Sequence, residues 1–212
     1  MQAEDTAGRR SLAEVAWLLH RSLEVPVVVE GVLLAAKRLL HAETAEVSLV
    51  RGAGVAGRPG AGATAGATAG VAAGGRSESR TGWWRVRISA DDWMDAREDD
   101  ALEPLEVACV AGSHALLAPR RARAGAGAEA DFLASRGFRD AMLAPLHGSE
   151  LTGLLLVANR RGRLGRPGAF THDDGDLLER LADEASLALD HALLVARLRA
   201  ATSRRRRRAA RG

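Results

Sequence analysis

Six histidines are the most obvious candidates for metal or haem ligation in this chain of 212 residues. They are spread along the sequence at His20, His41, His114, His147, His172 and His191. Metal motifs on helices and loops place their ligands a few residues apart, because the donor atoms must converge on one ion. No two of these histidines have that spacing, so the sequence assigns no metal site.

The single cysteine, Cys109, lies in the apolar segment 107–111. One cysteine excludes an intramolecular disulfide and a cysteine zinc cluster. An apolar neighbourhood favours a small buried side chain over a reactive thiol.

An acidic cluster in the middle of the chain resembles a cation site in composition only. Its members are Asp91, Asp92, Asp95, Glu98, Asp99 and Asp100. The alternating ligand spacing and central glycine of a calcium loop are missing. A short helical turn beginning at Asp91, with these acids on a solvated helix face, is the favoured interpretation.

Glycine-rich and arginine-rich stretches supply two further candidates. The segment 51–82 is composed largely of Gly and Ala, but no Gly-Lys-Ser/Thr follows it and no helix begins directly after it. We therefore expect a flexible insertion in a hairpin loop, not a phosphate-binding loop. The run from Arg204 to Arg208 could attract nucleic acid or an acidic membrane surface by charge alone, without reading sequence.

The charge balance confines that attraction to the C-terminal tail. The formal net charge is +3, and Arg204 to Arg208 with Arg211 carry six positive charges with no acid after Thr202. The remaining residues therefore carry a net charge of −3 and have no overall bias toward nucleic acid. The first ten residues have no apolar core typical of a signal peptide, so a cytoplasmic protein is expected.

The second half of the chain has the clearest structural pattern. Alternating residues from Met142 to His147, a Gly148–Ser149 turn and an apolar run from Leu151 to Ala158 predict an antiparallel hairpin. Thr171 followed by Asp174 predicts the start of a helix that continues to about Arg199.

The first half predicts further elements in a definite order. Helices are expected from Ser11 and over 27–40, strands over 45–50 and 83–89, a helix over 102–111, a short strand over 114–118 and a helix over 129–135. In the 83–89 strand Trp84, Val86 and Ile88 share one face, whereas Trp83, Arg85 and Arg87 share the other.

Several local sequences resemble the C-terminal half of a GAF domain. They are the Pro145-Leu146 pair, the Gly153-Leu154-Leu155 strand, Phe170-Thr171 with Asp174, and the His191-Ala-Leu-Leu194 segment. The resemblance covers 140–199 closely and extends more weakly back to Ser11. It is most similar to actinobacterial GAF modules that precede diguanylate cyclase or other output domains.

The resemblance implies an α+β fold. A GAF-like antiparallel sheet of five or six strands would carry the terminal helices on one face and short helices and loops, here 91–138, that roof a pocket on the other. Pocket candidates are Trp93, Met94, Cys109, His114, Phe132, Phe138 and Met142. His114 is the best haem-ligand candidate, because some haem-binding GAF domains place an axial histidine in this roof. Bilin-attaching members carry a Cys-His pair, whereas Val110 follows Cys109, and no cofactor is assigned.

The long C-terminal helix predicts a parallel homodimer. Apolar residues recur at three- and four-residue intervals at Leu178, Leu181, Ala185, Ala188, Ala192 and Val195, which is the spacing of a packed helical seam. Further apolar residues make Leu12, Leu19, Leu187, Leu194 and Leu198 the interface candidates. The alternative is that both sets pack within a monomer.

The resemblance implies a non-enzymatic regulatory module in signal transduction, which binds a small molecule or a partner protein and transmits through its terminal helices. Residues 11–199 are expected to form one domain, with 1–10 and 200–212 disordered. Two alternatives stay open: a GAF scaffold that associates with nucleic acid through Arg204 to Arg208, and a truncated remnant of a longer signalling protein.

Overall fold

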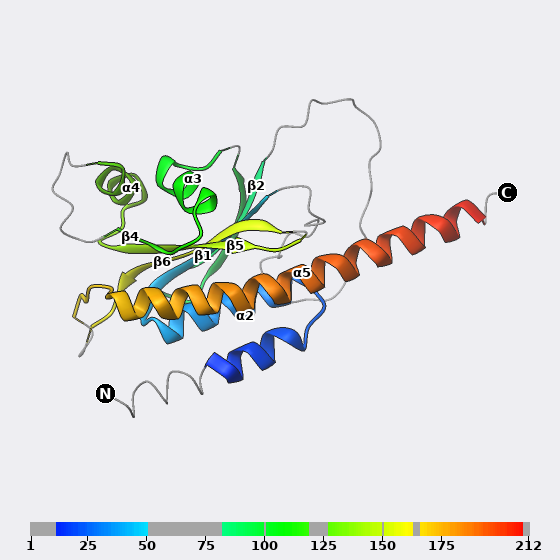
Figure 1. Ribbon diagram of the computed structural model, residues 1–212, viewed down its shortest axis with the longest axis horizontal. Helices are drawn as coiled ribbons and strands as arrows, with labels where there is room; N and C mark the ends of the chain where they lie inside the picture. Colours follow the sequence, from blue (N-terminus) through cyan, green and yellow to red (C-terminus); the bar gives the residue numbers. More distant parts are fainter. Residues whose placement is uncertain are drawn as a thin grey trace.

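A six-stranded antiparallel sheet forms the centre of the molecule (Figure 1). The computed structural model describes residues 12–50, 82–99, 101–118, 127–149, 151–162 and 166–209. The strands are β1 (Ala42–Val50), β2 (Trp83–Ile88), β3 (Met94–Asp99), β4 (Leu116–Ala118), β5 (Ala141–His147) and β6 (Thr152–Arg160). Their order across the sheet is β3-β2-β1-β6-β5-β4. This architecture confirms the predicted α+β fold.

The predicted hairpin is formed by β5 and β6, and it is covered on both faces. Along β5, Met142 belongs to the large hydrophobic cluster on one face of the sheet, and Leu143 belongs to a second hydrophobic cluster on the other face. Gly153 of β6 allows β1 to approach closely, because a Cβ atom there would lie 2.5 Å from the carbonyl oxygen of Ser48. A larger residue would push these central strands apart.

Helices α2 (Val25–Leu39) and α5 (His172–Ala209) cover one face of the sheet, and a first helix, residues 12–20, lies on their outer side, away from the sheet (Figure 1). Pro26 lies in the first turn of α2, where a missing N–H costs nothing. The valine-rich start of α2 has poor helix propensity, but Val28, Val29 and Val32 are buried against the sheet. Tertiary packing therefore decides that this segment is helical.

The predicted cap of α5 is present. The hydroxyl of Thr171 accepts a hydrogen bond from the N–H of Asp174 at 3.3 Å, and the Asp174 carboxylate accepts one from the N–H of Thr171 at 2.8 Å. The Asp174 carboxylate also contacts Arg160 at 3.1 Å, which fixes the start of the helix to the end of β6.

Helices α3 (Pro104–Ala111) and α4 (Ala128–Arg136) cover the other face over β4, β5 and β6. A capping box between Glu103 and Glu106 begins α3, and Gly137 ends α4 in the left-handed conformation with φ 66°. Two layers of helices thus enclose the sheet, as expected for the terminal and roof elements.

Two sequence predictions were wrong in their geometry. The acidic segment does not form a helical turn. Asp91 and Asp92 lie in a tight turn from Ser89 to Trp93, and Asp95, Glu98 and Asp99 lie in the edge strand β3, which pairs with β2 with Ile88 opposite Met94. In addition, α5 does not stop near Arg199 but continues to Ala209, so residues 200–209, expected to be disordered, are helical.

Residues 51–81 of the predicted insertion at 51–82 lie outside the described residues, as does the predicted disordered stretch at 1–10. Val50 and Trp83, on either side of the insertion, are paired partners of β1 and β2. None of the described helices is both long enough and apolar enough to cross a membrane.

We predict that Leu146→Asp and Leu154→Asp each prevent folding. Both side chains are fully buried, Leu146 toward α2 and α5 and Leu154 toward α3 and α4. An unpaired buried charge is expected to cost more than about 4 kcal/mol, a large share of a typical domain's stability. Circular dichroism melts provide the measurement. Val107→Asp, at a half-exposed site on α3, is the control, and a cooperative melt of either core variant would contradict the assignment.

Candidate functional site

Charged side chains gather between β1, β2 and the α3–α4 layer, where the sequence predicted a roofed pocket. Along β1 and β2 the apolar residues face α2 and α5, so the intervening polar residues face the other way. We call this group the charge cluster; it consists of Glu46, Arg85, Arg87, Asp99, Glu106 and Arg136.

Arg85 is the buried cation of the charge cluster. Its guanidinium donates to both carboxylate oxygens of Glu106, at 2.6 and 2.8 Å, and to Glu46 at 2.9 Å. Its Nε lies 2.6 Å from a carboxylate oxygen of Asp99. This fork arrangement fixes β2 to β1, β3 and α3, because a bidentate arginine pair has one favourable orientation.

Glu46 is the buried anion at the centre of the cluster. One oxygen accepts hydrogen bonds from Arg85 and Arg136, and the other accepts one from Arg87 at 2.7 Å. Burial by itself would raise the pKa of Glu46, but Arg136, Arg87 and Arg85 together outweigh burial and hold its pKa below the ordinary value. In the same way, burial would lower the pKa of Arg85, yet hydrogen bonds from its guanidinium to Glu106 raise it.

The cluster leaves little free space. The cavity bounded by Glu46, Arg85, Arg87, Asp95 and Arg97 has a volume of about 20 Å³. This is about enough for one water molecule. A polar ligand could therefore enter here only by taking over an existing ion pair.

Two buried polar atoms beside the cluster have unused hydrogen-bonding capacity. Within the described part of the chain, the Ser48 hydroxyl and Nε of Arg136 have no hydrogen-bond partner. A buried donor without a partner is costly, so both atoms favour a bound polar group or water.

The comparisons with known proteins decide the family. The GAF domain family matches residues 27–189. This chain belongs to the GAF domain family. The matched range includes the whole sheet and the first half of α5.

Solved GAF structures share this fold at low sequence identity. The GAF domain of an Acinetobacter phosphoenolpyruvate-protein phosphotransferase has a TM-score of 0.56 and 11% identity, over 89% of this chain and 96% of that one. A structure of a far-red-absorbing dark state with bound biliverdin has a TM-score of 0.54 and 13% identity, over 86% of this chain and 98% of that one. A phycoerythrobilin-bound GAF domain from a cyanobacterial phytochrome has a TM-score of 0.52 and 11% identity, over 88% and 96%. Comparison with curated proteins gives no match.

The described residues of this GAF domain do not fit a covalently attached bilin. Cys109 is completely buried, and burial, with a smaller contribution from Glu106, raises the pKa of its thiol to about 12. A neutral, enclosed thiol is a poor nucleophile. The cavity of about 20 Å³ in the charge cluster is also far too small for a tetrapyrrole.

Three of the predicted pocket residues come together under α3 and α4. Cys109, Phe132 and Phe138 belong to the apolar cluster of this face, and the two phenylalanine rings lie 6.4 Å apart. The Arg136 guanidinium lies 5.9 Å from the Phe132 ring and 5.8 Å from the Phe138 ring. These residues form the packed apolar edge of the charge cluster instead of lining an open pocket.

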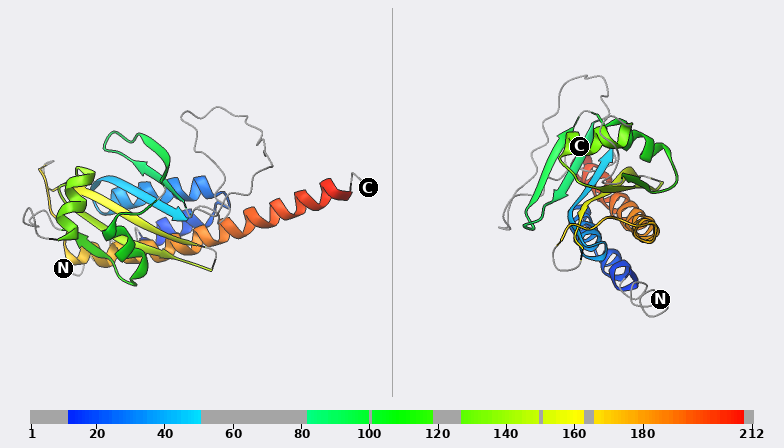
Figure 2. Two further views of the ribbon diagram at one scale, coloured as in Figure 1. Left: turned by 90° about the horizontal axis from the view of Figure 1, so that it is seen from above. Right: turned by 90° about the vertical axis from the view of Figure 1, so that its left-hand side faces the viewer.

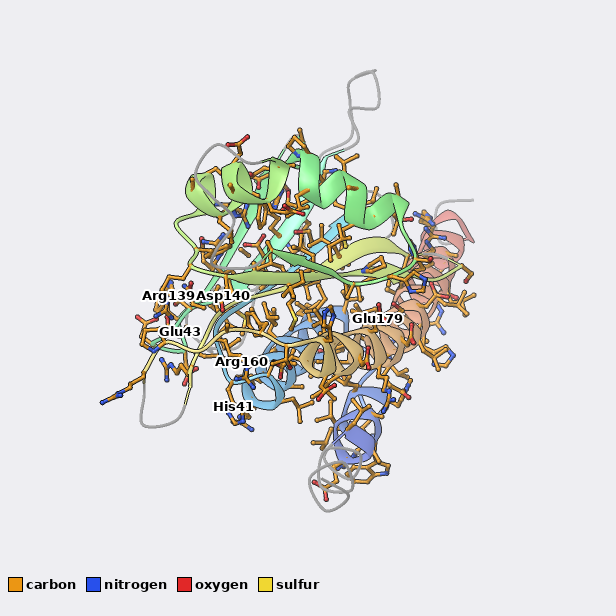
Figure 3. All side chains as sticks on the ribbon, turned by 60° about the vertical axis from the view of Figure 1, so that its left-hand side comes forward. His41, Glu43, Arg139, Asp140, Arg160 and Glu179 are labelled. Atoms are coloured by element: carbon orange, nitrogen blue, oxygen red, sulfur yellow. The ribbon has the colours of Figure 1, made fainter. Side chains whose placement is uncertain are left out.

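The other four predicted pocket residues lie elsewhere. Met94 and Met142 point to the α2–α5 face, since both belong to its apolar cluster. Trp93 is exposed beside the β2–β3 turn. The imidazole of His114 is 84% exposed, 3.8 Å from Glu179 of α5, and so lies outside the roof (Figure 3 labels Glu179). No group of three or more His, Cys, Asp and Glu side chains that could hold a metal is present among the described residues.

The predicted interface residues divide into two groups. Leu187, Leu194 and Leu198 are about half exposed on α5. Leu19 is buried in the core and Leu12 is partly buried against it, so these two do not form an open surface. Most of the predicted seam is likewise buried: Leu178, Leu181, Ala185, Ala188 and Ala192 are in the core, whereas Val195 is partly buried.

The sequence contains a signal for the charge cluster, although none of its members is among the predicted pocket residues. Arg85 and Arg87 alternate with apolar residues in β2, and Glu46 alternates with Ala45 and Val47 in β1. Charged residues on a strand face usually indicate solvent. Only the placement of α3 and α4 shows that this face is covered.

We predict that Glu46→Gln lowers the free energy of unfolding by about 3–5 kcal/mol at neutral pH, because three arginines lose their shared buried anion. The folded-state pKa of Glu46 is depressed, so its contribution is present above its unfolded pKa and is lost as pH falls through the folded value. The difference in urea midpoint between wild type and variant should therefore shrink with acidification. Glu14→Gln, at an exposed site, is the control, and a difference that is constant with pH would contradict the assignment.

Proposed function

We propose that this GAF domain is a non-enzymatic regulatory module that receives a small molecule or a partner protein and transmits the event through its terminal helices. The observation that carries the proposal is α5. It is one helix of 38 residues, about 57 Å long, that is both part of the core and an extension beyond the sheet (Figure 2). A rigid element shared in this way can pass a change in the domain to whatever contacts its far end.

The first half of α5 is firmly attached to the sheet. Leu178, Leu181 and Leu189 are fully buried. The Ser186 hydroxyl accepts a hydrogen bond from the N–H of His147 at 3.1 Å, and Ser149 donates to Asp190 through its N–H and its hydroxyl, at 3.0 and 2.7 Å. The helix therefore follows the β5–β6 hairpin as one body.

The middle of α5 offers three exposed leucines for a partner, Leu187, Leu194 and Leu198, which we call the apolar stripe. Glu184, Leu187, His191, Leu194 and Leu198 follow one another at three- and four-residue intervals, so they share a helix face. His20 of the first helix contacts Glu184 and His191, and next to it Trp17 and Leu18 are 62% and 57% exposed. Exposed apolar groups of this size on adjoining helices support a helical interface with a second copy of the chain.

Within such a module the charge cluster is the place where a polar small molecule would act. A ligand acceptor group that binds Arg136 would compete with Glu46 and Glu103. Loss of those contacts would loosen α4 from β1 and α3. The charges of the cluster neutralise one another, and the cavity beside them holds about one water molecule, so a ligand would act there by exchanging an existing ion pair.

We predict that the chain forms a parallel homodimer in micromolar solution and that Leu194→Glu shifts it to monomer, because a charge at the centre of the stripe must be desolvated on association. Multi-angle light scattering gives the mass directly. Val107→Glu introduces the same charge at a half-exposed apolar site on α3 and should leave the dimer intact. A monomeric wild type, or a mass that both variants leave unchanged, would overturn the helical interface.

One observation favours the alternative of a nucleic-acid contact. The helix continues through Arg204 to Arg208, and Arg204 and Arg206 are exposed on the part of α5 that extends past the sheet (Figure 1). A cationic helix held away from the domain can follow a phosphate backbone without reading bases.

We predict that deletion of 204–212 abolishes any retention on a nucleic-acid column at moderate salt, because these residues hold the excess positive charge. The chain should still be a dimer, since the apolar stripe ends at Leu198. Retention that survives the deletion would place the contact elsewhere, and loss of the dimer would show that the tail belongs to the interface.

A further inference from the structure

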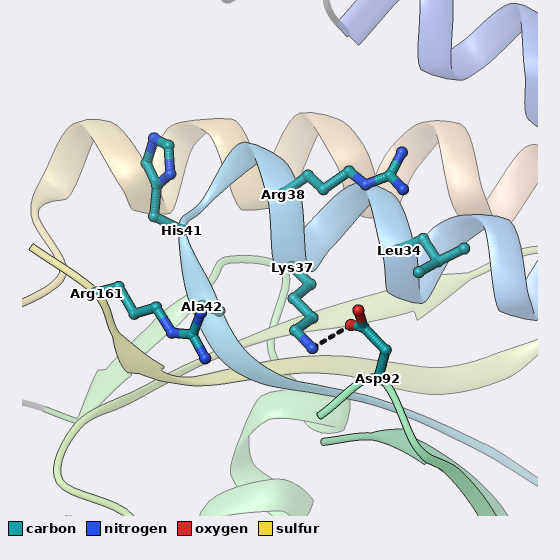
Figure 4. A pocket seen from close by; sticks show the side chains of 7 residues that line it. All are labelled: Leu34, Lys37, Arg38, His41, Ala42, Asp92 and Arg161. Carbon is teal, nitrogen blue, oxygen red and sulfur yellow. Dashed lines mark hydrogen bonds and ion pairs between the residues drawn. The ribbon is translucent and has the colours of Figure 1, made fainter. Parts of the chain in front are cut away.

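A second cavity, which shares no lining residue with the one in the charge cluster, lies beside α2. Its volume is about 330 Å³, and it is bounded by the C-terminal end of α2, the β2–β3 turn and the residue after β6. We call it the basic groove. Its polar lining is Lys37, Arg38, His41, Arg161 and Asp92, and its apolar lining is Leu34 and Ala42 (Figure 4).

The groove carries an excess of positive charge. Lys37, Arg38 and Arg161 are permanent cations, and Asp92 is the one carboxylate among the lining residues that the structure describes. The Lys37 ammonium donates to Asp92 at 2.5 Å and to the carbonyl oxygen of Ser89. Its hydrogen bond holds the pKa of Asp92 below the ordinary value, so this pair is neutral overall. Two positive charges are left on the lining.

Arg161 is placed in the groove by its backbone, and its side chain is only weakly held. Its N–H donates to the carbonyl oxygen of His41 at 2.7 Å. Its side chain is 49% exposed and lies 3.7 Å from Glu43, whose other oxygen contacts Arg139 at 3.1 Å. Figure 3 shows His41, Glu43 and Arg139 together at this end of the sheet. Because Glu43 is shared, the Arg161 guanidinium keeps donors for a further anion.

The backbone around the groove adopts a conformation that L-residues rarely use. In the described chain, three residues other than glycine have positive φ, and two of them, His41 at 51° and Asp92 at 61°, line the groove. Such positions gather at ligand sites, where the surrounding structure enforces them. At His41 the reversal ends α2 and starts β1, so it brings the basic last turn of α2 next to Arg161.

We infer that the basic groove binds a small organic anion that carries a phosphate group. Arg161 can hold two phosphate oxygens with its planar fork, and the Lys37 ammonium extends into the same space from α2 (Figure 4). The volume exceeds what a phosphate ion alone requires and falls in the range of small-molecule sites. Leu34 and Ala42 provide apolar contact for the organic part. This inference is independent of the proposed helical output.

The side chains that line the basic groove differ in whether they already form an ion pair with one another. In the view of Figure 4 Lys37 reaches toward Asp92, while the ends of Arg38 and His41 lie on the far side of the helix from that pair. Lys37 is only 10% exposed and supports the β2–β3 turn, so its substitution would disturb folding. Arg161 is therefore the better position for a test.

The test is a titration of the full chain, labelled with ¹⁵N, with ribose 5-phosphate, inorganic phosphate and ribose. We expect ribose 5-phosphate to shift the amide signals of residues 41, 92 and 161 to saturation, more tightly than inorganic phosphate and with no effect of ribose. Arg161→Gln should raise the dissociation constant at least about tenfold. Arg180→Gln, which removes the same charge from an exposed site on α5, should leave it unchanged.

The inference is overturned if ribose 5-phosphate gives no saturating shift at these residues, or if the two variants bind alike. Equal affinity for inorganic phosphate and ribose 5-phosphate would reduce the groove to an adventitious ion site and overturn it as well. A thermal melt verifies that Arg161→Gln is folded, and Arg161→Lys, which keeps the charge but removes the planar fork, repeats the comparison if it is not.

Discussion

The buried carboxylate of Glu46 is the group on which the arrangement of this domain depends. It lies on the central strand pair and is fully enclosed, so folding must supply cations to it from other elements. Arg85 and Arg87 come from β2 and Arg136 comes from the end of α4. Arg85 then binds Glu106, which ties in α3. One anion thus requires two strands and two helices to meet in a single geometry.

The two faces of the sheet are stabilised by different physics. Against α2 and α5 the contact is apolar, non-directional and tolerant of small shifts. Over β1 to β3 the opposite face is held by charged hydrogen bonds that have a fixed direction, and the apolar cluster under α3 and α4 is limited to β4, β5 and β6. A bound polar group would therefore disturb the charged face first, whereas α5 would move with the sheet.

The charge cluster and the basic groove differ in how completely their charges are paired. In the cluster each buried arginine reaches carboxylates at hydrogen-bond distance, and the free volume is about that of a water molecule. In the groove Arg161 has one shared, distant carboxylate and a cavity of about 330 Å³ in front of it. Arginine thus stabilises the structure in the charge cluster, whereas in the basic groove Arg161 keeps donors for an anion.

By itself, the sequence determined the elements whose signals are local: the β5–β6 hairpin, the Thr171 cap, α3, α4 and the GAF family. These features depend on residues close together in the chain, so their spacing is visible in the sequence. The tertiary structure decided what each face meets. In the folded chain Asp95, Glu98 and Asp99 lie on an edge strand, and most of the predicted dimer seam of α5 is buried. Met94 and Met142 face α2 and α5, and Glu46 is covered by other elements. A charged residue in a strand is normally predicted to be exposed. Its burial depends on ion-pair partners from segments far away in the sequence, and no local pattern indicates them.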